Sequence, residues 1–178
     1  MGVREIWSQC RYAEIAYSNA LNKSERDVAV TFSSIHSFLS HCGLISKLLW
    51  SRALAENIQS KNLANILLVP EDSKIRDLSF RNILEHYDKE LKKWIREKGE
   101  DINIWDNNIG PIEAFNFQNA IRVRHFDPTT SIYTLIDSDL NLQEVYTAVL
   151  DIKQKADDWV KINIDRSNPN PLSNMHVT

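Results

Sequence analysis

Apolar residues recur at intervals of three and four along most of the chain, a spacing that predicts four main helices. The first lies before a break at residues 22–24, the second over about 25–55, the third over about 71–98 and the last over about 142–162. The side chains expected to face the core from the first, second and last helices are Ile6, Cys10, Tyr12, Ala13, Ala16, Tyr17 and Ala20, then Val28, Phe32, Ile35, Phe38, Leu39, Cys42, Ile45 and Leu49, then Val145, Val149, Ile152, Ala156, Trp159 and Val160.

The third predicted helix carries a narrower apolar seam. Its members recur at alternating steps of four and three and are Phe80, Leu84, Tyr87, Leu91 and Trp94. Gly99 is the expected end of this helix, because glycine readily adopts the backbone conformation that terminates one.

After Gly99 the pattern changes. Polar turn residues at 106–111 are followed by two stretches, 121–126 and 131–136, in which apolar and polar residues alternate. Alternation at period two predicts strands, and the Asp-Pro-Thr-Thr sequence at 127–130 predicts a turn between them. We therefore expect one β-hairpin in this region.

Together these elements predict an all-α fold, a four-to-five-helix up-and-down bundle in which the hairpin, about residues 120–137, is a small insertion. Residues 1–164 are expected to form a single domain. Residues 165–178 are rich in Asn, Pro and Ser, and we expect them to form a flexible C-terminal tail.

Composition narrows the setting of the protein. The chain has 178 residues, a formal charge of −3 and two cysteines, Cys10 and Cys42. Two cysteines are too few for a disulfide framework, so we expect a reducing environment and two thiols packed in the core. The first residues lack an apolar signal core, and no stretch approaches about 18 uninterrupted apolar residues. We expect a soluble, cytoplasmic protein that does not span a membrane.

Several kinds of site leave no signature in the sequence. No Gly-rich loop is followed by Lys and Ser or Thr, which excludes a P-loop, and the repeated Glu-x-x-His of di-metal bundles is absent. His36 and His41 lie on the second helix without partners at zinc-ligand spacing, so packing or surface roles are expected for them. The sequence predicts no metal and no cofactor.

One polar segment of the third helix stands out. With about 100° per residue, Arg81 lies about 100° from the apolar seam, Asn82 about 160° away and His86 about 120° away on the other side. Asn82 and His86 are also an i, i+4 pair, so they are neighbours on the helix surface. These three residues form either an ordinary solvated face or a site that points away from the chain's own core.

This arrangement resembles the HEPN superfamily (higher eukaryotes and prokaryotes nucleotide-binding). The family signature is Arg-x4–6-His on a helix of an all-α bundle, with a polar residue after the Arg, and Arg81, Asn82 and His86 match each place. The resemblance covers residues 1–100 and the last helix, whereas the hairpin is not part of the basic family pattern. About 80 residues follow the motif here, while many HEPN domains carry it near their final helix. Asp88 stands where HEPN toxins with nucleotidyltransferase antitoxins have the Tyr of Arg-x4-His-x-Tyr, so modification of a tyrosine is not implied.

The resemblance implies RNA cleavage without a metal. Imidazole is the side chain that titrates near neutral pH, so His86 would take the proton of a 2′-OH, which then attacks the adjacent phosphate. Arg81 would bind the charge that develops on the phosphate, and Asn82 would orient either the phosphate or the imidazole. The products would be a 2′,3′-cyclic phosphate and a 5′-hydroxyl.

One Arg and one His are few groups for such a site, and HEPN enzymes dimerise so that two copies of the motif face one cleft. A homodimer is therefore expected here. Basic residues that continue along the same side of the helix are expected to contact RNA phosphates. They are Lys89, Lys93 and Arg96.

Three hypotheses follow. The first is a HEPN-like endoribonuclease, a toxin or phage-defence effector with an antitoxin or neighbouring protein as a further partner. The second is a non-catalytic HEPN-like dimer that binds RNA, nucleotides or a protein, and the acidic neighbours Glu85 and Asp88 favour it because they weaken attraction for RNA. The third is an unrelated helical bundle. The basic strand residues Arg122, Arg124 and His125 are either a solvated face or a contact for substrate or partner.

Overall fold

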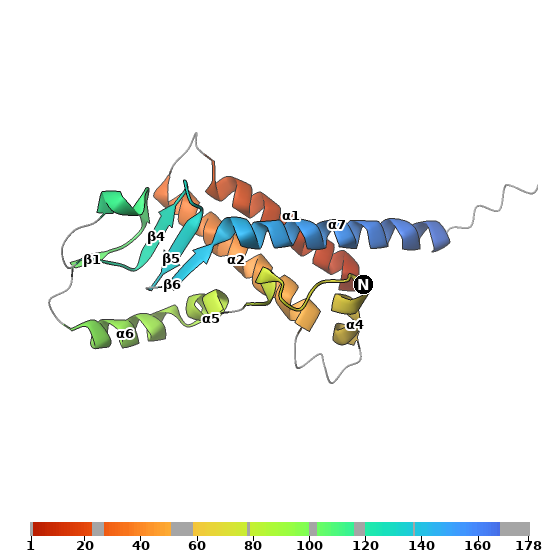
Figure 1. The fold of residues 1–178 in the computed structure, drawn as a ribbon, viewed down its shortest axis with the longest axis horizontal. Helices are drawn as coiled ribbons and strands as arrows, with labels where there is room; N and C mark the ends of the chain where they lie inside the picture. The colour runs from red at the N-terminus through yellow and green to blue at the C-terminus, as the bar shows by residue number, and fades with distance from the viewer. Residues whose placement is uncertain are drawn as a thin grey trace, which may run out of the picture.

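The computed structural model describes residues 2–22, 27–50, 59–77, 79–99, 103–115, 120–136 and 138–167. In that part of the chain the structure is mostly helical, with a small sheet at one end (Figure 1). The helices are α1 (Gly2–Ala20), α2 (Val28–Trp50), α4 (Gln59–Ile66), α5 (Ser79–Glu85), α6 (Tyr87–Lys98) and α7 (Leu142–Ser167), with short 3-10 turns at Lys74–Arg76 and Ile112–Phe115. The strands are β1 (Asn103–Trp105), β2 (Asn108–Ile109), β3 (Ala120–Arg122), β4 (Arg124–Asp127), β5 (Ile132–Leu135) and β6 (Ser138–Asn141).

Helices α1, α2 and α7 form the main core, in which α1 contacts both of the others (Figure 1). Tyr17 contacts α7 from α1. Its hydroxyl donates to Oε1 of Gln143 at 2.8 Å, and its ring stacks on that of Tyr146 with centroids 4.0 Å apart. The predicted core faces of the first and second helices are confirmed, with two exceptions. Tyr12 is 51% exposed and Val28 is 45% exposed, because Tyr12 lies at the edge of the α1 stripe and Val28 is the first residue of α2. In α7 the expected core residues from 145 to 156 are buried, and the last two are half-buried.

Helix α2 is the most apolar element. By length and composition alone it could cross a membrane, since its mean hydropathy reaches 1.3 over 18 residues. Its large side chains are nevertheless packed in the protein core, where Phe38 and Ile45 have no exposed surface. Packing against α1 accounts for this hydropathy, and it is the pattern of a core helix in a soluble protein.

The predicted hairpin is present as the antiparallel pair β4 and β5, in which Phe126 faces Tyr133. Its turn is fixed by the carboxylate of Asp127, which accepts hydrogen bonds from the backbone N and the hydroxyl of Thr129 at 2.8 and 2.6 Å. The all-α prediction was too simple, because this hairpin belongs to a four-stranded sheet of order β2-β4-β5-β6. Strands β1 and β3 pair in a second, two-stranded parallel sheet. Strands of two to four residues are too short for a periodic pattern to show in the sequence.

The predicted long third helix over 71–98 is wrong as a continuous element. Residues 71–77 form turns and a 3-10 segment, and the helical part is divided into α5 and α6. The division falls at His86, whose φ of −118° and ψ of 28° leave helical geometry. The predicted end is confirmed: Gly99 has a φ of +91°, and its N–H donates to the carbonyl of Ile95.

The last helix is longer than predicted. Helix α7 continues to Ser167, so residues 165–167 are helical rather than part of a tail. The rest of the predicted tail, residues 168–178, lies outside the described residues.

Candidate functional site

The three motif residues lie where α5 meets α6. Arg81 and Asn82 belong to α5, and the carboxylate of Asp77 accepts a hydrogen bond from the backbone N of Ser79, the first residue of this helix, at 2.8 Å. The backbone N of His86 donates to the carbonyl of Asn82 at 3.0 Å, so the helical turn that makes these two residues neighbours is intact. For Arg81 the backbone is described and the side chain lies outside the described part.

His86 has a second structural role, because α6 begins at its carbonyl oxygen. That oxygen accepts hydrogen bonds from the backbone N of Lys89 and of Glu90, both at 3.0 Å. The imidazole makes no capping bond to the helix that follows it. The backbone of His86 is therefore fixed from both sides while its ring stays available.

The polar side chains predicted for this site are exposed wherever the structure describes them. Those whose side chains are described are Asn82, His86, Lys89, Lys93 and Arg96. Within the described part of the chain, no hydrogen bond or ion pair engages any of these five side chains. Structural polar residues in a folded protein commonly pair with neighbours, whereas these stay free to meet a ligand or a second chain.

The basic residues of α6 form one continuous face with His86. At about 100° per residue, Lys89, Lys93 and Arg96 lie within about 80° of the His86 direction. Trp94, which is 6% exposed, marks the inward side of the helix and lies about 100° to 160° from these three basic residues. Three ammonium or guanidinium groups thus extend from His86 along about 15 Å of helix surface, at about 1.5 Å per residue.

Acidic residues near the motif have a local structural explanation. Asp88 and Glu90 lie in the first turn of α6, and carboxylates there are stabilised by the positive end of the helix dipole. Both belong to the turn that starts beside His86. These carboxylates therefore stabilise the first turn of α6, and they also repel an anionic ligand at this position.

A groove of about 310 Å³ lies beside the motif, between α2 and α5. Its walls are formed by His36, Ser40, Leu44 and Lys47 of α2 and by Leu84 and Glu85 of α5. Burial and the positive charge of Arg124 lower the pKa of His36, which favours the neutral form of its imidazole. Sequence reasoning did not connect this polar stripe of α2 with the motif, although the steps of four, four and three along α2 mark it as one face.

Arg124 of β4 pairs with Asp106, which lies between β1 and β2. Its Nε donates to Oδ1 of Asp106 at 2.8 Å and its terminal N–H groups also pair with that carboxylate. The Asp106 carboxylate raises the pKa of Arg124, which is therefore a fixed cation. The sequence predicted that Arg122, Arg124 and His125 form either a solvated face or a ligand contact. Two of these residues instead have structural roles, since Arg124 is paired with Asp106 and His125 is 1% exposed.

The two cysteines pack as predicted. Cys10 has no exposed surface and Cys42 is 6% exposed. Burial raises the pKa of Cys10 to about 12 and that of Cys42 well above its usual value, so neither is a thiolate at pH 7. Nucleophilic cysteine chemistry is therefore disfavoured at both positions.

Comparison of the chain with protein-family models, with curated proteins and with solved structures gives no match.

Proposed function

We propose that this protein is a metal-independent endoribonuclease of the HEPN type, acting in the cytoplasm as a homodimer. The observation that carries the proposal is the state of Asn82 and His86: both side chains are exposed on one helical turn, and neither is engaged by the described part of the chain. Arg81 lies one residue before Asn82 on the same helix. This placement supports the motif as a site rather than as part of the core.

Each residue has a defined chemical role in the proposed reaction. His86 removes the proton of a ribose 2′-OH, and the resulting oxygen attacks the adjacent phosphorus. Arg81 binds the phosphate oxygens through its planar fork and stabilises their added negative charge. The bond to the 5′-oxygen breaks, that oxygen takes up a proton, and a 2′,3′-cyclic phosphate and a 5′-hydroxyl result. Asn82 positions the phosphate or the ring of His86.

In the proposed dimer, two copies of the motif face one cleft. A single Arg-His pair on an exposed helix provides little exclusion of water, and the proton that the leaving oxygen takes up needs a second acid. A two-fold related copy supplies a second His86 and a second Arg81. In each copy the α6 face of Lys89, Lys93 and Arg96 extends from the cleft, where it supplies contacts for neighbouring phosphates.

A biological setting follows from the same resemblance. A ribonuclease of this kind would act as a toxin or a phage-defence effector, with an antitoxin or a neighbouring protein to restrain it. Growth arrest on expression of the wild-type chain, relieved by Arg81→Ala, is the expected sign of such an activity.

A second candidate function is a non-catalytic HEPN-like dimer that binds RNA, nucleotides or a protein. It is favoured by one observation: Glu85 and Asp88 are both exposed beside the motif, where their carboxylates oppose a phosphate. In that case the basic α6 face would bind its ligand without cleaving it.

Analysis of the RNA ends distinguishes these functions. Single-stranded RNA incubated with the purified protein in EDTA should yield fragments with 2′,3′-cyclic phosphate and 5′-hydroxyl ends. Binding without cleavage would support the second candidate. Cleavage that requires Mg²⁺, or that leaves 3′-hydroxyl and 5′-phosphate ends, would rule out the proposed mechanism.

A further inference from the structure

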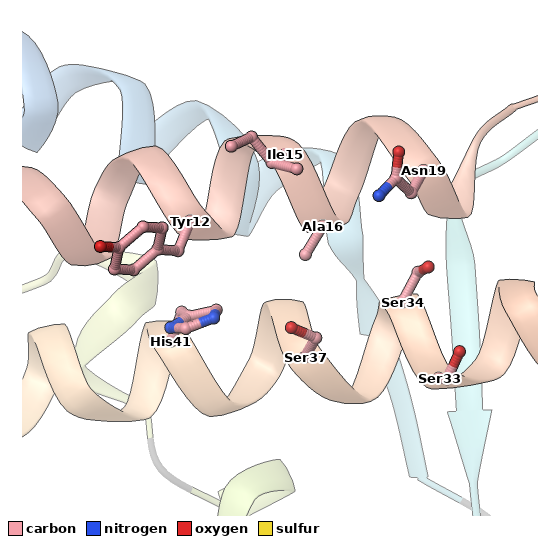
Figure 2. Close-up of a pocket in the computed structure, with 8 residues that line it drawn as sticks. All are labelled: Tyr12, Ile15, Ala16, Asn19, Ser33, Ser34, Ser37 and His41. Atoms are coloured by element: carbon pink, nitrogen blue, oxygen red, sulfur yellow. The ribbon is translucent and has the colours of Figure 1, made fainter.

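A second cavity, of about 350 Å³, lies between α1 and α2 and plays no part in the proposed nuclease (Figure 2). From α1 come Tyr12, Ile15 and Asn19, and from α2 come Ser33, Ser37 and His41. The residues that line it include no Lys, Arg, Asp or Glu. The cavity is therefore polar but uncharged, which disfavours phosphates, carboxylates and cations as ligands.

A chain of hydrogen bonds fixes which nitrogen of His41 carries the proton. The side-chain amide nitrogen of Gln9 donates to Oε1 of Glu5 at 2.8 Å, and a carboxylate can only accept. The amide oxygen of Gln9 is thus the atom that faces His41, and it lies 2.7 Å from Nδ1. Since a carbonyl oxygen can only accept, Nδ1 of His41 must be the donor and carry the hydrogen.

The other ring nitrogen of His41 is therefore an acceptor. Burial lowers the pKa of His41, so the ring is neutral at pH 7 and Nε2 holds a free electron pair. No hydrogen bond within the described residues uses this nitrogen. Figure 2 shows the ring of His41 facing Tyr12 of α1, with Ser37 further along α2 on the same side of the helix.

Two exposed apolar side chains of α1 line the same cavity. The ring of Tyr12 lies 5.4 Å from that of His41 between centroids, tilted by 48°, and is 51% exposed. Ile15, one turn further along α1, is 47% exposed. A flat apolar wall beside a single strong acceptor suits a planar ring that carries a hydrogen-bond donor at its edge.

We propose that this cavity binds a small, uncharged, planar heteroaromatic molecule whose ring packs against Tyr12 and Ile15 and whose N–H donates to Nε2 of His41. The hydroxyl group of Ser37, one turn from His41 on α2, contacts a further polar atom at the edge of the ligand. The site requires neither a second copy of the chain nor RNA, so it can be tested independently of the proposed nuclease activity.

Indole and 1-methylindole provide a matched pair of probes, because methylation removes the one N–H of indole. The binding of each to the full-length protein is followed by the ¹⁵N resonances of the His41 ring. Free protein should show the neutral form with the proton on Nδ1. Indole should shift the Nε2 resonance with saturation, and 1-methylindole should bind about five- to tenfold more weakly, the value of one neutral hydrogen bond.

Variants identify the cavity as the binding site. His41→Phe keeps a flat ring but loses the acceptor, so it should bind the two probes equally, and Tyr12→Ala should weaken both. His36→Ala is the matched control, since His36 is an exposed histidine of the same helix outside this cavity, and it should bind as wild type does. The proposal would be overturned if the free protein carries the proton on Nε2 or if wild type does not bind indole. It would also be overturned if wild type binds both probes equally or if Tyr12→Ala leaves binding unchanged.

Discussion

The guanidinium of Arg124 lies over the ring of Tyr87, with its carbon 5.4 Å from the ring centroid. Arg124 belongs to β4, and Tyr87 is the residue directly after His86. This contact joins the sheet to the point where α5 gives way to α6. The added sheet, which an all-α bundle would lack, thus helps to hold the candidate site.

Removing this cation should loosen the start of α6. Arg124→Ala loses both the cation–π contact and the pairing with Asp106, and because the pair is partly exposed we expect a cost of about 1 kcal/mol in the free energy of unfolding. Faster hydrogen exchange at the amides of residues 86–90 should accompany it. Arg124→Lys keeps the charge but not the planar fork, so its effect should be intermediate. Unchanged exchange in Arg124→Ala would show that the contact does not position α6.

Acid should destabilise the fold through His125. Burial and the positive charge of Arg122 lower its pKa below the unfolded value of about 6.5, so as pH falls below that value the unfolded chain takes up the proton first. The free energy of unfolding should therefore decrease as the pH is lowered from about 6.5, and His125 should account for at most about 1.4 kcal/mol of this decrease per pH unit. Above about pH 6.5, the contribution of His125 to the free energy of unfolding should no longer depend on pH. The pKa values of His36 and His41 are lowered too, and these partly exposed rings add smaller losses in the same direction.

Urea denaturation at about pH 7.5, 6.5 and 5.5 measures this dependence. Arg122→Gln removes the neighbouring positive charge and should reduce the slope below pH 6.5. A fold that is equally stable or more stable at the lowest pH would contradict the assignment of a buried neutral imidazole to His125.

The thiols of Cys10 and Cys42 should resist modification in the native protein. Both are buried and have raised pKa values, and it is the thiolate that reacts. A thiol-specific disulfide reagent at about pH 8 should label neither residue in the folded chain and both after denaturation. Fast labelling of native protein, at rates near those of a free thiol, would show that the α1–α2 core opens readily.

Mixing two inactive variants tests whether the nuclease site is shared between subunits. Arg81→Ala and His86→Ala should each be inactive as homodimers. A mixed dimer retains one intact Arg81 and one intact His86 on opposite subunits, but it lacks the second His86 that would protonate the leaving oxygen. Half of a re-equilibrated equimolar mixture is mixed dimer, so the mixture should recover measurable cleavage at less than about a quarter of the wild-type rate. A mixture as inactive as its components would contradict a composite site.

The sequence predicted the helical core because its signal is long. In α1, α2 and α7, apolar positions recur at helical spacing over several turns. The buried faces that contain Phe38, Ile45 and Ile152 could therefore be predicted from the sequence. The sheet could not be predicted in full, since strands of two to four residues are too short to show a period and the parallel pairing of β2 with β4 depends on distant contacts. The break at His86 was missed for a related reason: the apolar seam continues through it without a change in spacing.

Some features of the candidate site could likewise be predicted from the sequence, and others could not. The exposure of Asn82 and His86 follows from their angle to the seam, which local helix geometry preserves across one turn. The groove with His36 and Lys47 depends on which face of α2 meets α5, and that is decided by tertiary packing rather than by the spacing of residues within either helix.

The rate of RNA cleavage in EDTA by His86→Ala, compared with wild type, tests the central claim most directly. Both proteins should be confirmed as folded dimers before the comparison. The proposed role as general base predicts a loss of at least about 100-fold, with binding of RNA retained through the α6 face. Wild-type protein that does not cleave RNA under these conditions, or a His86→Ala variant that cleaves at the wild-type rate, would contradict it.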